Sequence, residues 1–430
     1  MMTPTDPATF GTYFRDRSAE TLGIENPRQP ARREVEITDV QTTIVQGNYQ
    51  WILVRIYTDA GVTGTGEAYF GSGVAGEIAS MREHLIGENP LDVDRLYEHL
   101  IWRTSGRGSL AGTVVTAISG IEIALHDLAG KLLEVPAYQL LGGKYRDEVR
   151  IYCDTHAGAH PESVDAAALS PDDVYTPAAY VEAAEGVIEE GFDALKFDLD
   201  IPSSATKDPA NGHLRHAEVD RIVEIVAAVT EAVPADVDVA FDLHWIWSAD
   251  SARRLARALE PYDVWWLEDP VPPETEDVLA SIVDGTATTI ATGENCYRKA
   301  GQRRLLEEGF TDVIQPDVPK VGGMREAYKI ATIAELYATP VALHNVSSPV
   351  GTMAGVHVAA AISNFLALEW HARDVPFWPD VVAESVIEDG TVTVPEAPGL
   401  GVTVDDDVVA AHMADGETLF DPRDHRSGAT

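Results

Sequence analysis

Apolar and polar residues follow two successive patterns along the chain, and each pattern predicts its own domain. Between residues 34 and 147, stretches that read as strands come first and stretches with helical spacing follow. Strands followed by helices are typical of an α+β domain. The predicted strands are 35–45 (VEITDVQTTIV), 50–58 (QWILVRIYT) and 62–69 (VTGTGEAY), and the predicted helices lie near 74–88, 91–103 and 109–133, the last closed by Pro136.

From residue 148 to residue 372, short apolar runs alternate with amphipathic stretches such as 217–233 and 324–338. A nearly continuous apolar run indicates a strand buried on both faces, as in a parallel sheet covered by helices. Eight such strands predict a parallel (β/α) barrel. An open, doubly wound sheet is the alternative, but it requires a glycine-rich phosphate turn, and none follows the first strands of this region. The eight runs are VRIYCDTHA, ALKFDLD, DVAFDLH, VWWLEDP, TTIATGE, DVIQPD, PVALHN and FLALEW.

Nearly every predicted barrel strand ends on a polar or ionisable residue. The carboxyl ends of the strands form the face of a barrel where catalysis takes place. From Asp242 onward these residues recur at intervals of 26, 26, 23, 27 and 25 positions, about the length of one strand, one helix and two loops. Because 70 of the 430 residues are Asp or Glu, a single carboxylate has little weight, and the interpretation depends on the set. The set comprises Lys196, Asp198, Asp242, His244, Glu268, Glu294, Asp317, His344 and Glu369.

Three of these carboxylates, Asp242, Glu268 and Glu294, end three neighbouring strands and are expected to converge on one point. Carboxylates at one point repel each other unless a cation lies between them. Oxygen ligands suit a hard cation, and a site with few protein ligands favours Mg²⁺ over Ca²⁺ or Zn²⁺. The sequence therefore predicts a Mg²⁺ site with open positions for water and substrate oxygens.

Two histidines are expected to face the same cavity. Asp317 and His344 end neighbouring strands, which lie about 4.8 Å apart in a sheet. The carboxylate can therefore orient the imidazole and raise its proton affinity, so His344 is a candidate general base. Alternation along a strand places His244 on the same face as Asp242, where it can protonate a leaving hydroxyl group.

Other residues are candidates for contacts with the substrate. Lys196 ends a predicted barrel strand and is expected to face the same cavity. Glu369 can hydrogen-bond the substrate carboxylate when protonated, and an ion pair with Arg373 is the alternative. Tyr69 and Trp370 are candidate wall residues of the substrate cavity, with packing as the alternative for each.

The charge balance limits the possible partners. The chain has 70 Asp and Glu against 31 Lys and Arg, a net charge of −39 at pH 7. Such a surface repels nucleic acid and anionic membranes, so we expect neither as a partner. The acidic residues are spread through patterned apolar segments, which argues against a disordered acidic protein. A halophilic host explains the charge better, because salt screens the self-repulsion.

Further features predict a reduced, cytoplasmic protein. The N-terminus lacks the apolar centre of a secretory signal, and the chain has no run of eighteen or more apolar residues. Cys153 and Cys296 are too few for a disulfide framework and are expected to be reduced. Residues 1–33 are polar, contain four prolines and are interpreted as an extension or an oligomer arm.

On these residues the sequence resembles the enolase superfamily, specifically the mandelate racemase subgroup and its acid-sugar dehydratases. The resemblance covers about residues 34–400. It rests on GIEIALHDLAGKLLEVPAYQLLGG (120–143) in the first domain and on FDLH, WLEDP, TGEN, IQPDVPKVGGM, LHN and ALEW in the barrel. Several motifs in the same order make the resemblance specific.

The resemblance implies a modified (β/α)₇β barrel at 148–372 and an α+β capping domain at 34–147 whose loops select the substrate. It also implies a C-terminal segment, 373–430, that returns to the capping domain, and a symmetric homo-oligomer. By comparison residue by residue, the Mg²⁺ ligands of the family are matched by Asp242, Glu268 and Glu294, and its Asp–His dyad is matched by Asp317 and His344. Glu369 resembles the acid that binds the substrate carboxylate. Asp242-x-His244 resembles the motif whose histidine protonates the departing hydroxyl.

One motif departs from the family pattern. Many members carry Lys-x-Lys at the end of the second barrel strand, with the second lysine as a base on the opposite face of the substrate. Here the motif is Lys196-Phe-Asp198. An aspartate cannot take over that lysine's role, so racemisation with two bases is disfavoured, and Asp198 is a candidate substrate-binding residue.

The expected reaction is Mg²⁺-dependent dehydration of an aldonate, such as gluconate, galactonate, xylonate or arabinonate, to its 2-keto-3-deoxy acid. A racemase or epimerase of a 2-hydroxy acid is the nearest alternative, and a catalytically silent sugar-acid-binding protein is another. Product analysis separates the first two, since only dehydration yields a 2-keto-3-deoxy acid. A zinc hydrolase is disfavoured because the first strands lack a histidine-rich ligand set.

Overall fold

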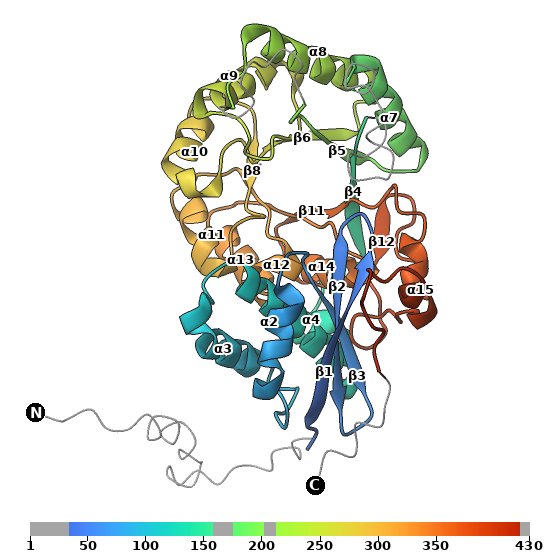
Figure 1. Cartoon of the computed structure of the whole chain (residues 1–430). Coiled ribbons are helices and arrows are strands. Elements are labelled where there is room, and N and C mark those ends of the chain that lie inside the picture. The colour runs from blue at the N-terminus through green and yellow to red at the C-terminus, as the bar shows by residue number, and fades with distance from the viewer. Residues whose placement is uncertain (1–33, 158–174, 202–211, 422–430) are drawn as a thin grey trace, which may run out of the picture. The chain divides into compact units, whose positions relative to one another are not determined.

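The structure is a computed structural model that describes residues 34–157, 175–201 and 212–421 (Figure 1). Contacts divide the chain into two units, Met1–Val35 and Glu36–Thr430, and the fold below is that of the second unit. The polar extension predicted at 1–33 lies outside the described residues.

An antiparallel sheet of three strands and the helices that follow it form the N-terminal part, as the sequence pattern predicts. Helix α4 packs against β3, where Gly64 and Gly66 allow a close approach. A Cβ atom at Gly66 would lie 2.4 Å from the backbone nitrogen of Ala124. The elements are β1 (Ile37–Gln46), β2 (Gln50–Thr58), β3 (Thr63–Ala68), α2 (Val74–Met81), α3 (Val93–Arg103), α4 (Thr113–Leu133) and α5 (Ala137–Leu140).

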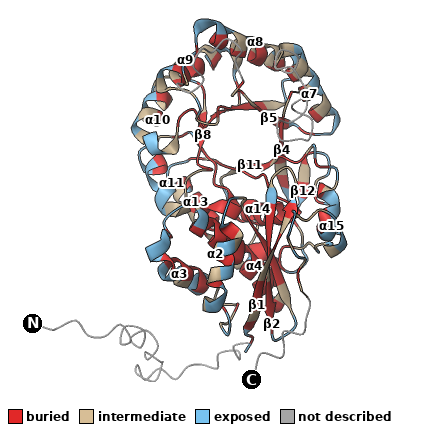
Figure 2. Cartoon of the chain, viewed as in Figure 1, coloured by how far each residue is buried: buried red, intermediate tan, exposed pale blue. Residues whose placement is uncertain are grey.

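Helix α4 is apolar over most of its length. By length and composition it could cross a membrane, and it is the one helix in the described part of the chain of which this is true. However, 94% of its most apolar window is buried inside the protein, and Figure 2 shows it in the interior. Packing in the core therefore accounts for its composition.

Eight parallel strands form a closed barrel, because β4 to β11 pair in chain order and β11 pairs with β4. A helix lies between each strand and the next, and these helices surround the barrel (Figure 1). This arrangement confirms the predicted (β/α)₇β barrel. The strands are β4 (Glu148–Thr155), β5 (Ala194–Asp198), β6 (Asp238–Asp242), β7 (Leu267–Glu268), β8 (Ile290–Thr292), β9 (Val313–Ile314), β10 (Val341–Leu343) and β11 (Phe365–Trp370). The helices are α7 (Pro177–Glu189), α8 (His216–Ala232), α9 (Ala249–Leu259), α10 (Glu276–Val283), α11 (Arg298–Glu307), α12 (Val318–Val321), α13 (Met324–Leu336) and α14 (Pro349–Ala361).

Helix α14 was not predicted from the sequence pattern. Every residue of PVGTMAGVHVAAA is buried, and Figure 2 shows the helix in the interior. A helix that is buried on all sides has no polar stripe, so its sequence lacks the period of 3.6 residues that identifies amphipathic helices.

A glycine-rich segment, residues 71–76 (GSGVAG), forms the turn before α2 and the first residues of that helix. Its G-x-G-x-x-G spacing is that of a dinucleotide-binding turn, which belongs to a parallel βαβ unit. Here the turn follows the antiparallel strand β3, outside the barrel. It therefore gives no support to an open, doubly wound sheet.

The C-terminal segment contacts both parts of the structure. Strand β12 (Thr391–Thr393) pairs antiparallel with β4 of the barrel, a pairing that the sequence did not predict. Helix α15 (Asp406–Ala411) lies against the capping sheet, where both carboxylate oxygens of Asp406 accept hydrogen bonds from Arg55 at 3.0 and 2.7 Å. Val45 of β1 also forms a β-bridge with Met413.

Two buried carboxylates of the capping domain accept hydrogen bonds at the N-termini of barrel helices. Glu67 of β3 accepts from the Ser348 backbone N–H (3.0 Å) and hydroxyl (2.5 Å) and from the Gly351 N–H (2.9 Å), at the start of α14. Glu122 of α4 accepts from the N–H of Met324 (2.8 Å), at the start of α13. Because a helix N-terminus favours negative charge, these contacts hold the capping domain against the barrel.

The burial of Glu67 predicts a pH-dependent stability. Burial raises the pKa of Glu67 from 4.5 to about 7, against the opposing hydrogen bonds from Ser348 and Gly351. Since the folded pKa exceeds the unfolded one, stability is lost as the pH rises through this interval. Glu67→Gln does not titrate. Between about pH 4 and about pH 8, the wild type should therefore lose about 3 kcal/mol of its free energy of unfolding relative to the variant.

Chemical denaturation of both proteins in high salt at the two pH values measures this difference. A difference that is the same at both values would show that Glu67 does not titrate in this interval.

Candidate active site

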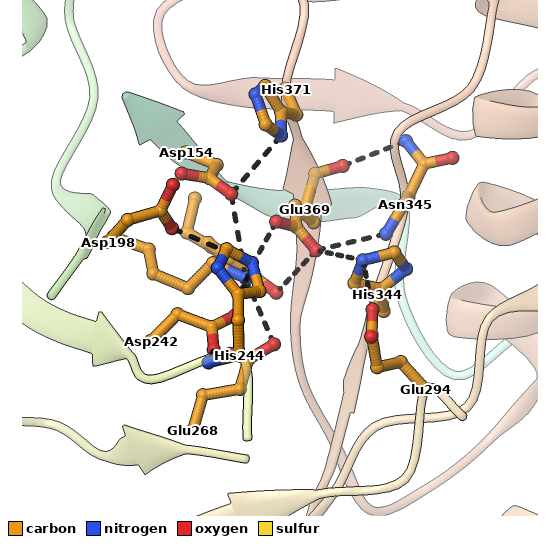
Figure 3. Close-up of polar contacts among 12 residues, drawn as sticks. Asp154, Asp198, Asp242, His244, Glu268, Glu294, His344, Asn345, Glu369 and His371 are labelled. Carbon is orange, nitrogen blue, oxygen red and sulfur yellow. Dashed lines mark hydrogen bonds and ion pairs between the residues drawn. The ribbon is translucent and has the colours of Figure 1, made fainter. Parts of the chain in front are cut away.

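Lys196 on β5 contacts carboxylates from four other strands. Figure 3 labels these four carboxylates, Asp154, Asp242, Glu268 and Glu369. Its Nζ is 3.0 Å from Glu268 Oε1 and 2.9 Å from Glu369 Oε1. It is 3.4 Å from Asp242 Oδ2 and 3.6 Å from Asp154 Oδ2. All five side chains are buried. One ammonium group cannot neutralise four carboxylates, so the cluster carries an excess of negative charge.

This excess shifts the protonation equilibria in the cluster. Burial, followed by the charges of Asp242 and Glu369, raises the pKa of Glu268 well above its usual value against the effect of Lys196. Burial also raises the pKa of Glu369. Burial alone would lower the pKa of Lys196, but the surrounding carboxylates raise it well above its usual value. Lys196 is therefore charged at neutral pH.

Glu369 is held by neutral donors as well as by the ammonium group. Its Oε2 accepts hydrogen bonds from the Tyr152 hydroxyl and the Asn345 backbone N–H, both at 3.1 Å. The alternative ion pair between Glu369 and Arg373 is wrong, because the Arg373 guanidinium pairs with Glu190 at 2.7 Å.

The structure brings His344 and Asp317 together as the sequence predicts. His344 Nδ1 is 2.7 Å from Asp317 Oδ2, and the two residues form a parallel β-bridge. The other ring nitrogen, Nε2, is 2.5 Å from Glu294 Oε2 and 3.8 Å from Glu369 Oε2. Asp317 therefore orients the ring, and Nε2 is the nitrogen that faces the carboxylate cluster.

The charges around His344 control its protonation. Burial disfavours the imidazolium form, but Glu294 and Glu369 together with the Asp317 hydrogen bond raise the pKa of His344 well above its usual value. A cation that neutralises Glu294 would remove the largest of these attractions. His344 could then be neutral at physiological pH, as a general base must be.

His244 lies just after β6 in a turn set by Asp242. The Asp242 Oδ1 atom accepts a 2.7 Å hydrogen bond from the His244 backbone N–H, and His244 has a left-handed φ of 42°. Its Nε2 is 3.5 Å from Asp242 Oδ2 and 3.8 Å from Asp198 Oδ1, and its Nδ1 is 3.4 Å from Asp200 Oδ2. The charge of Asp242 raises the pKa of His244 to about 12 and outweighs the effect of burial, which acts to lower it. His244 can therefore donate a proton at neutral pH.

The three predicted metal ligands lie around the site with different partners. Asp242 and Glu268 share Lys196, whereas Glu294 pairs with His344. Among the described residues, two groups of acidic and histidine side chains have ligand atoms within 4.8 Å of one another and could hold a metal ion. These groups are Asp198, Asp242 and His244, and Asp154, His156 and His371.

The two predicted wall residues have different environments. The Tyr69 ring lies 6.2 Å from the His344 ring, between centroids, so Tyr69 borders the site. The Trp370 ring stacks on Phe192, with centroids 5.5 Å apart and planes within 4°. Since Glu369 points into the barrel, the next residue along the strand points outward. These contacts favour the packing role for Trp370.

Comparisons with known proteins agree with this geometry. Residues 29–142 match the family described as mandelate racemase / muconate lactonizing enzyme, N-terminal domain, and residues 179–408 match the family described as enolase C-terminal domain-like. The chain belongs to the enolase superfamily. The match covers the capping domain and most of the barrel, and it confirms the family that the sequence motifs indicated.

Several relatives in the superfamily are sugar-acid dehydratases. A D-xylonate dehydratase of Haloferax volcanii is 60% identical over 410 residues, which cover 95% of this chain and 96% of that protein. A D-gluconate dehydratase of Thermoproteus tenax is 30% identical over 85% of this chain and 70% of its own length. A crystal structure of a mandelate racemase/muconate lactonizing enzyme-like protein from Rubrobacter xylanophilus has a TM-score of 0.85 and 43% identity, covering 90% of this chain and 100% of that one.

Enzymes of the enolase superfamily bind Mg²⁺. Of the three predicted ligands, Asp242 belongs to one of the two groups that could hold a metal ion, whereas Glu268 and Glu294 belong to neither. The donors near Lys196 are oxygen atoms of buried carboxylates, which suit a hard cation. Their charge exceeds that of the one ammonium group among them.

Asp154, His156 and His371 were not predicted as site residues. Asp154 is the next-to-last residue of strand β4, in the same position as the predicted residues of the later strands, and is buried beside Lys196. His156 and His371 lie two residues beyond Asp154 and Glu369. The alternation that related His244 to Asp242 would have identified both histidines.

Proposed function

We propose that this protein is a Mg²⁺-dependent sugar-acid dehydratase that converts an aldonate to its 2-keto-3-deoxy acid. The observation that carries the proposal is the pair of histidines beside the Lys196 cluster, each oriented by a carboxylate at its Nδ1 atom. His344 contacts Asp317 at 2.7 Å, and His244 contacts Asp200 at 3.4 Å. Loss of water needs one group that accepts a proton and one that donates a proton, and this pair supplies both.

The proposed steps use side chains whose positions are described above. His344 Nε2 accepts the C2 proton, and the ammonium group of Lys196 stabilises the negative charge that develops on the substrate carboxylate. His244 then donates a proton to the C3 hydroxyl group, the C3–O bond breaks, and water leaves. The resulting enol tautomerises to the 2-keto-3-deoxy acid. When bound by Asp242, Glu268 and Glu294, Mg²⁺ would supply Lewis acidity toward the substrate oxygens.

Xylonate is the first candidate substrate. The relative from Haloferax volcanii that is named a D-xylonate dehydratase matches this chain over almost its full length. The gluconate and galactonate dehydratases are more distant, at 30 to 31% identity. Epimerisation is disfavoured, because the position that would hold a second base is occupied by Asp198.

We also propose that the enzyme works as a homo-oligomer in the cytoplasm. Both cysteines, Cys153 and Cys296, are free thiols in the structure, as expected in a reducing compartment. Light scattering on the purified protein in high salt would measure the number of subunits.

Removal of the metal is expected to abolish turnover. In a screen of pentonates and hexonates with purified protein in high salt, we expect a 2-keto-3-deoxy product from xylonate. Treatment with EDTA should reduce the rate to background, and an excess of Mg²⁺ should restore it, since carboxylates alone cannot stabilise an enediolate. Turnover that persists in EDTA would contradict the proposed metal dependence. An epimer as the product would contradict dehydration.

A further inference from the structure

A second buried lysine, Lys320, borders the active site, and the proposed steps assign it no role. It is 6% exposed and lies in α12, just beyond Asp317. Helix α12 follows β9, whereas Lys196 lies on β5. Since β4 to β11 close the barrel in chain order, β5 and β9 lie across the barrel from each other. The two buried lysines therefore come from opposite sides of the site.

The ammonium group of Lys320 has no ion pair with the described residues. The other five lysines in 34–157, 175–201 and 212–421 each have a carboxylate oxygen at 3.6 Å or closer. Lys320 instead donates a 2.6 Å hydrogen bond to Asn295 Oδ1, an uncharged acceptor. Taking an ammonium group out of water is costly, and an ion pair is the usual compensation. Another interaction must therefore hold this group in the site.

That interaction is with the ring of Tyr69, which lies just beyond β3 of the capping domain. Lys320 Nζ is 4.5 Å from the ring centroid, within the range of a cation–π interaction. The Tyr69 backbone N–H also donates a 3.1 Å hydrogen bond to the carbonyl of Pro319, the residue before Lys320. Helix α12 thus fixes both the backbone and the ring of Tyr69. The same ring lies 6.2 Å from the His344 ring, between centroids.

The ammonium group is itself held from the side of the proposed base. Asn295 Nδ2 donates a 2.5 Å hydrogen bond to Glu294 Oε1, which leaves the Oδ1 atom of the same amide to accept from Lys320. Glu294 Oε2, in turn, is 2.5 Å from His344 Nε2. The contacts therefore form a continuous chain from His344 through Glu294, Asn295 and Lys320 to Tyr69.

We propose that Lys320 is a positioning residue that holds the ring of Tyr69 beside His344 during proton abstraction. This inference rests on the proposed function and extends it to a contact between the capping domain and the barrel. Tyr69 ends a row of stacked rings in the capping domain, because it stacks on Phe70 at 4.4 Å and Phe70 stacks on Tyr49 at 4.4 Å. Lys320 therefore fastens this row at the point where the base acts. A displaced ring there would disturb the geometry of proton transfer.

Direct contact between Lys320 and the substrate carboxylate is the competing interpretation, since a buried ammonium group without an ion pair could bind an anion. Two observations disfavour it. The residue is only 6% exposed, and its ammonium group is already occupied by Asn295 and by the Tyr69 ring. The interpretations differ in one respect: only positioning through Tyr69 makes the effect of Lys320 depend on a ring at position 69.

The test measures how the effect of Lys320→Met on the kcat for dehydration depends on residue 69. In the wild type we expect a loss of about thirtyfold, the value of a desolvated cation–π contact. Tyr69→Phe keeps the ring, so Lys320→Met should again cost about thirtyfold in that background. In the Tyr69→Leu background it should cost about threefold or less, because the ring is already gone. The substrate is xylonate or the sugar acid that the screen identifies.

The matched control is Lys329→Met, which also removes an ammonium group that faces a tyrosine ring. Lys329 Nζ is 6.0 Å from the Tyr97 ring centroid and 3.7 Å from Asp94 Oδ1, at the contact between α13 and α3 of the capping domain. This variant should keep kcat within about twofold of the wild type, because a partly exposed pair contributes little. Chemical denaturation in high salt identifies the variants that fold.

The outcomes separate this inference from the proposed function. Equal losses in the three backgrounds would indicate direct contact with the substrate or a general packing role, and would overturn the inference while leaving the dehydratase intact. If Lys320→Met does not fold, the Tyr69 variants decide: a Tyr69→Leu enzyme as fast as Tyr69→Phe would show that no ring is needed and overturn the inference. A wild type with no dehydratase activity on any sugar acid would overturn both.

Discussion

His344→Asn is expected to lower the kcat for dehydration by roughly 10³-fold with little change in KM, because it removes the group that accepts the C2 proton. Asparagine is close in size to histidine and can still hydrogen-bond Asp317, whose Oδ2 lies 2.7 Å from His344 Nδ1 in the wild type. The fold should therefore be preserved. Release of the 2-keto-3-deoxy product measures turnover, and exchange of the C2 proton with D₂O measures proton abstraction separately.

The matched control is His84→Asn, a change of the same kind in the capping domain. The His84 side chain is partly exposed, and its nearest carboxylate, on Glu83, is 3.9 Å away. This variant should turn over at the rate of the wild type. If His344→Asn kept turnover within about threefold of the wild type, or still exchanged the C2 proton at the same rate, His344 would not be the base.

Much of the fold was predictable because its elements have periodic sequences. The strands β1 and β2 are rich in β-branched residues. The barrel strands are short apolar runs followed by amphipathic helices such as α8 and α13. Helix α14 has no polar face, and β12 is only three residues long. These elements depend on tertiary contacts that local patterns do not contain.

The site was predictable to the extent that it depends on strand ends. Regular intervals placed Asp317 and His344 on neighbouring strands, and they are in contact. The intervals contain no information on which cation each carboxylate contacts. The sequence thus left open that Asp242 and Glu268 would share Lys196 while Glu294 would pair with His344.

The extreme net charge also relates the sequence to the site. A chain of net charge −39 has few cations to place beside its buried carboxylates. In the described structure one lysine, Lys196, is in contact with four buried carboxylates. The composition that indicated a halophilic host agrees with the relative from Haloferax volcanii. The same composition makes each buried cation more important than in a protein of balanced charge.

Lys196→Met is therefore expected to affect both stability and activity. Methionine fills a similar volume but leaves Asp154, Asp242, Glu268 and Glu369 without their shared cation. Removing one partner from a buried charge cluster costs about 3–5 kcal/mol of the free energy of unfolding at neutral pH. The variant should recover part of this loss near pH 5, because its carboxylates then take up protons that relieve their repulsion. The kcat should fall by about 10²-fold or more, since the charge that stabilises the enediolate is gone.

Chemical denaturation in high salt at pH 7 and pH 5, together with product assays, tests these expectations. Lys299→Met is the control: Lys299 is partly exposed and pairs with Glu326 at 2.8 Å, and Lys329, at 3.6 Å, stays beside the same carboxylate. Lys299→Met should lower the free energy of unfolding by about 1 kcal/mol or less at either pH and leave turnover unchanged. If Lys196→Met were no less stable than Lys299→Met at pH 7, the carboxylates around Lys196 would have to be largely protonated in the wild type. A cluster of neutral acids would not bind Mg²⁺ tightly, so the same result would also contradict the metal site built on Asp242 and Glu268.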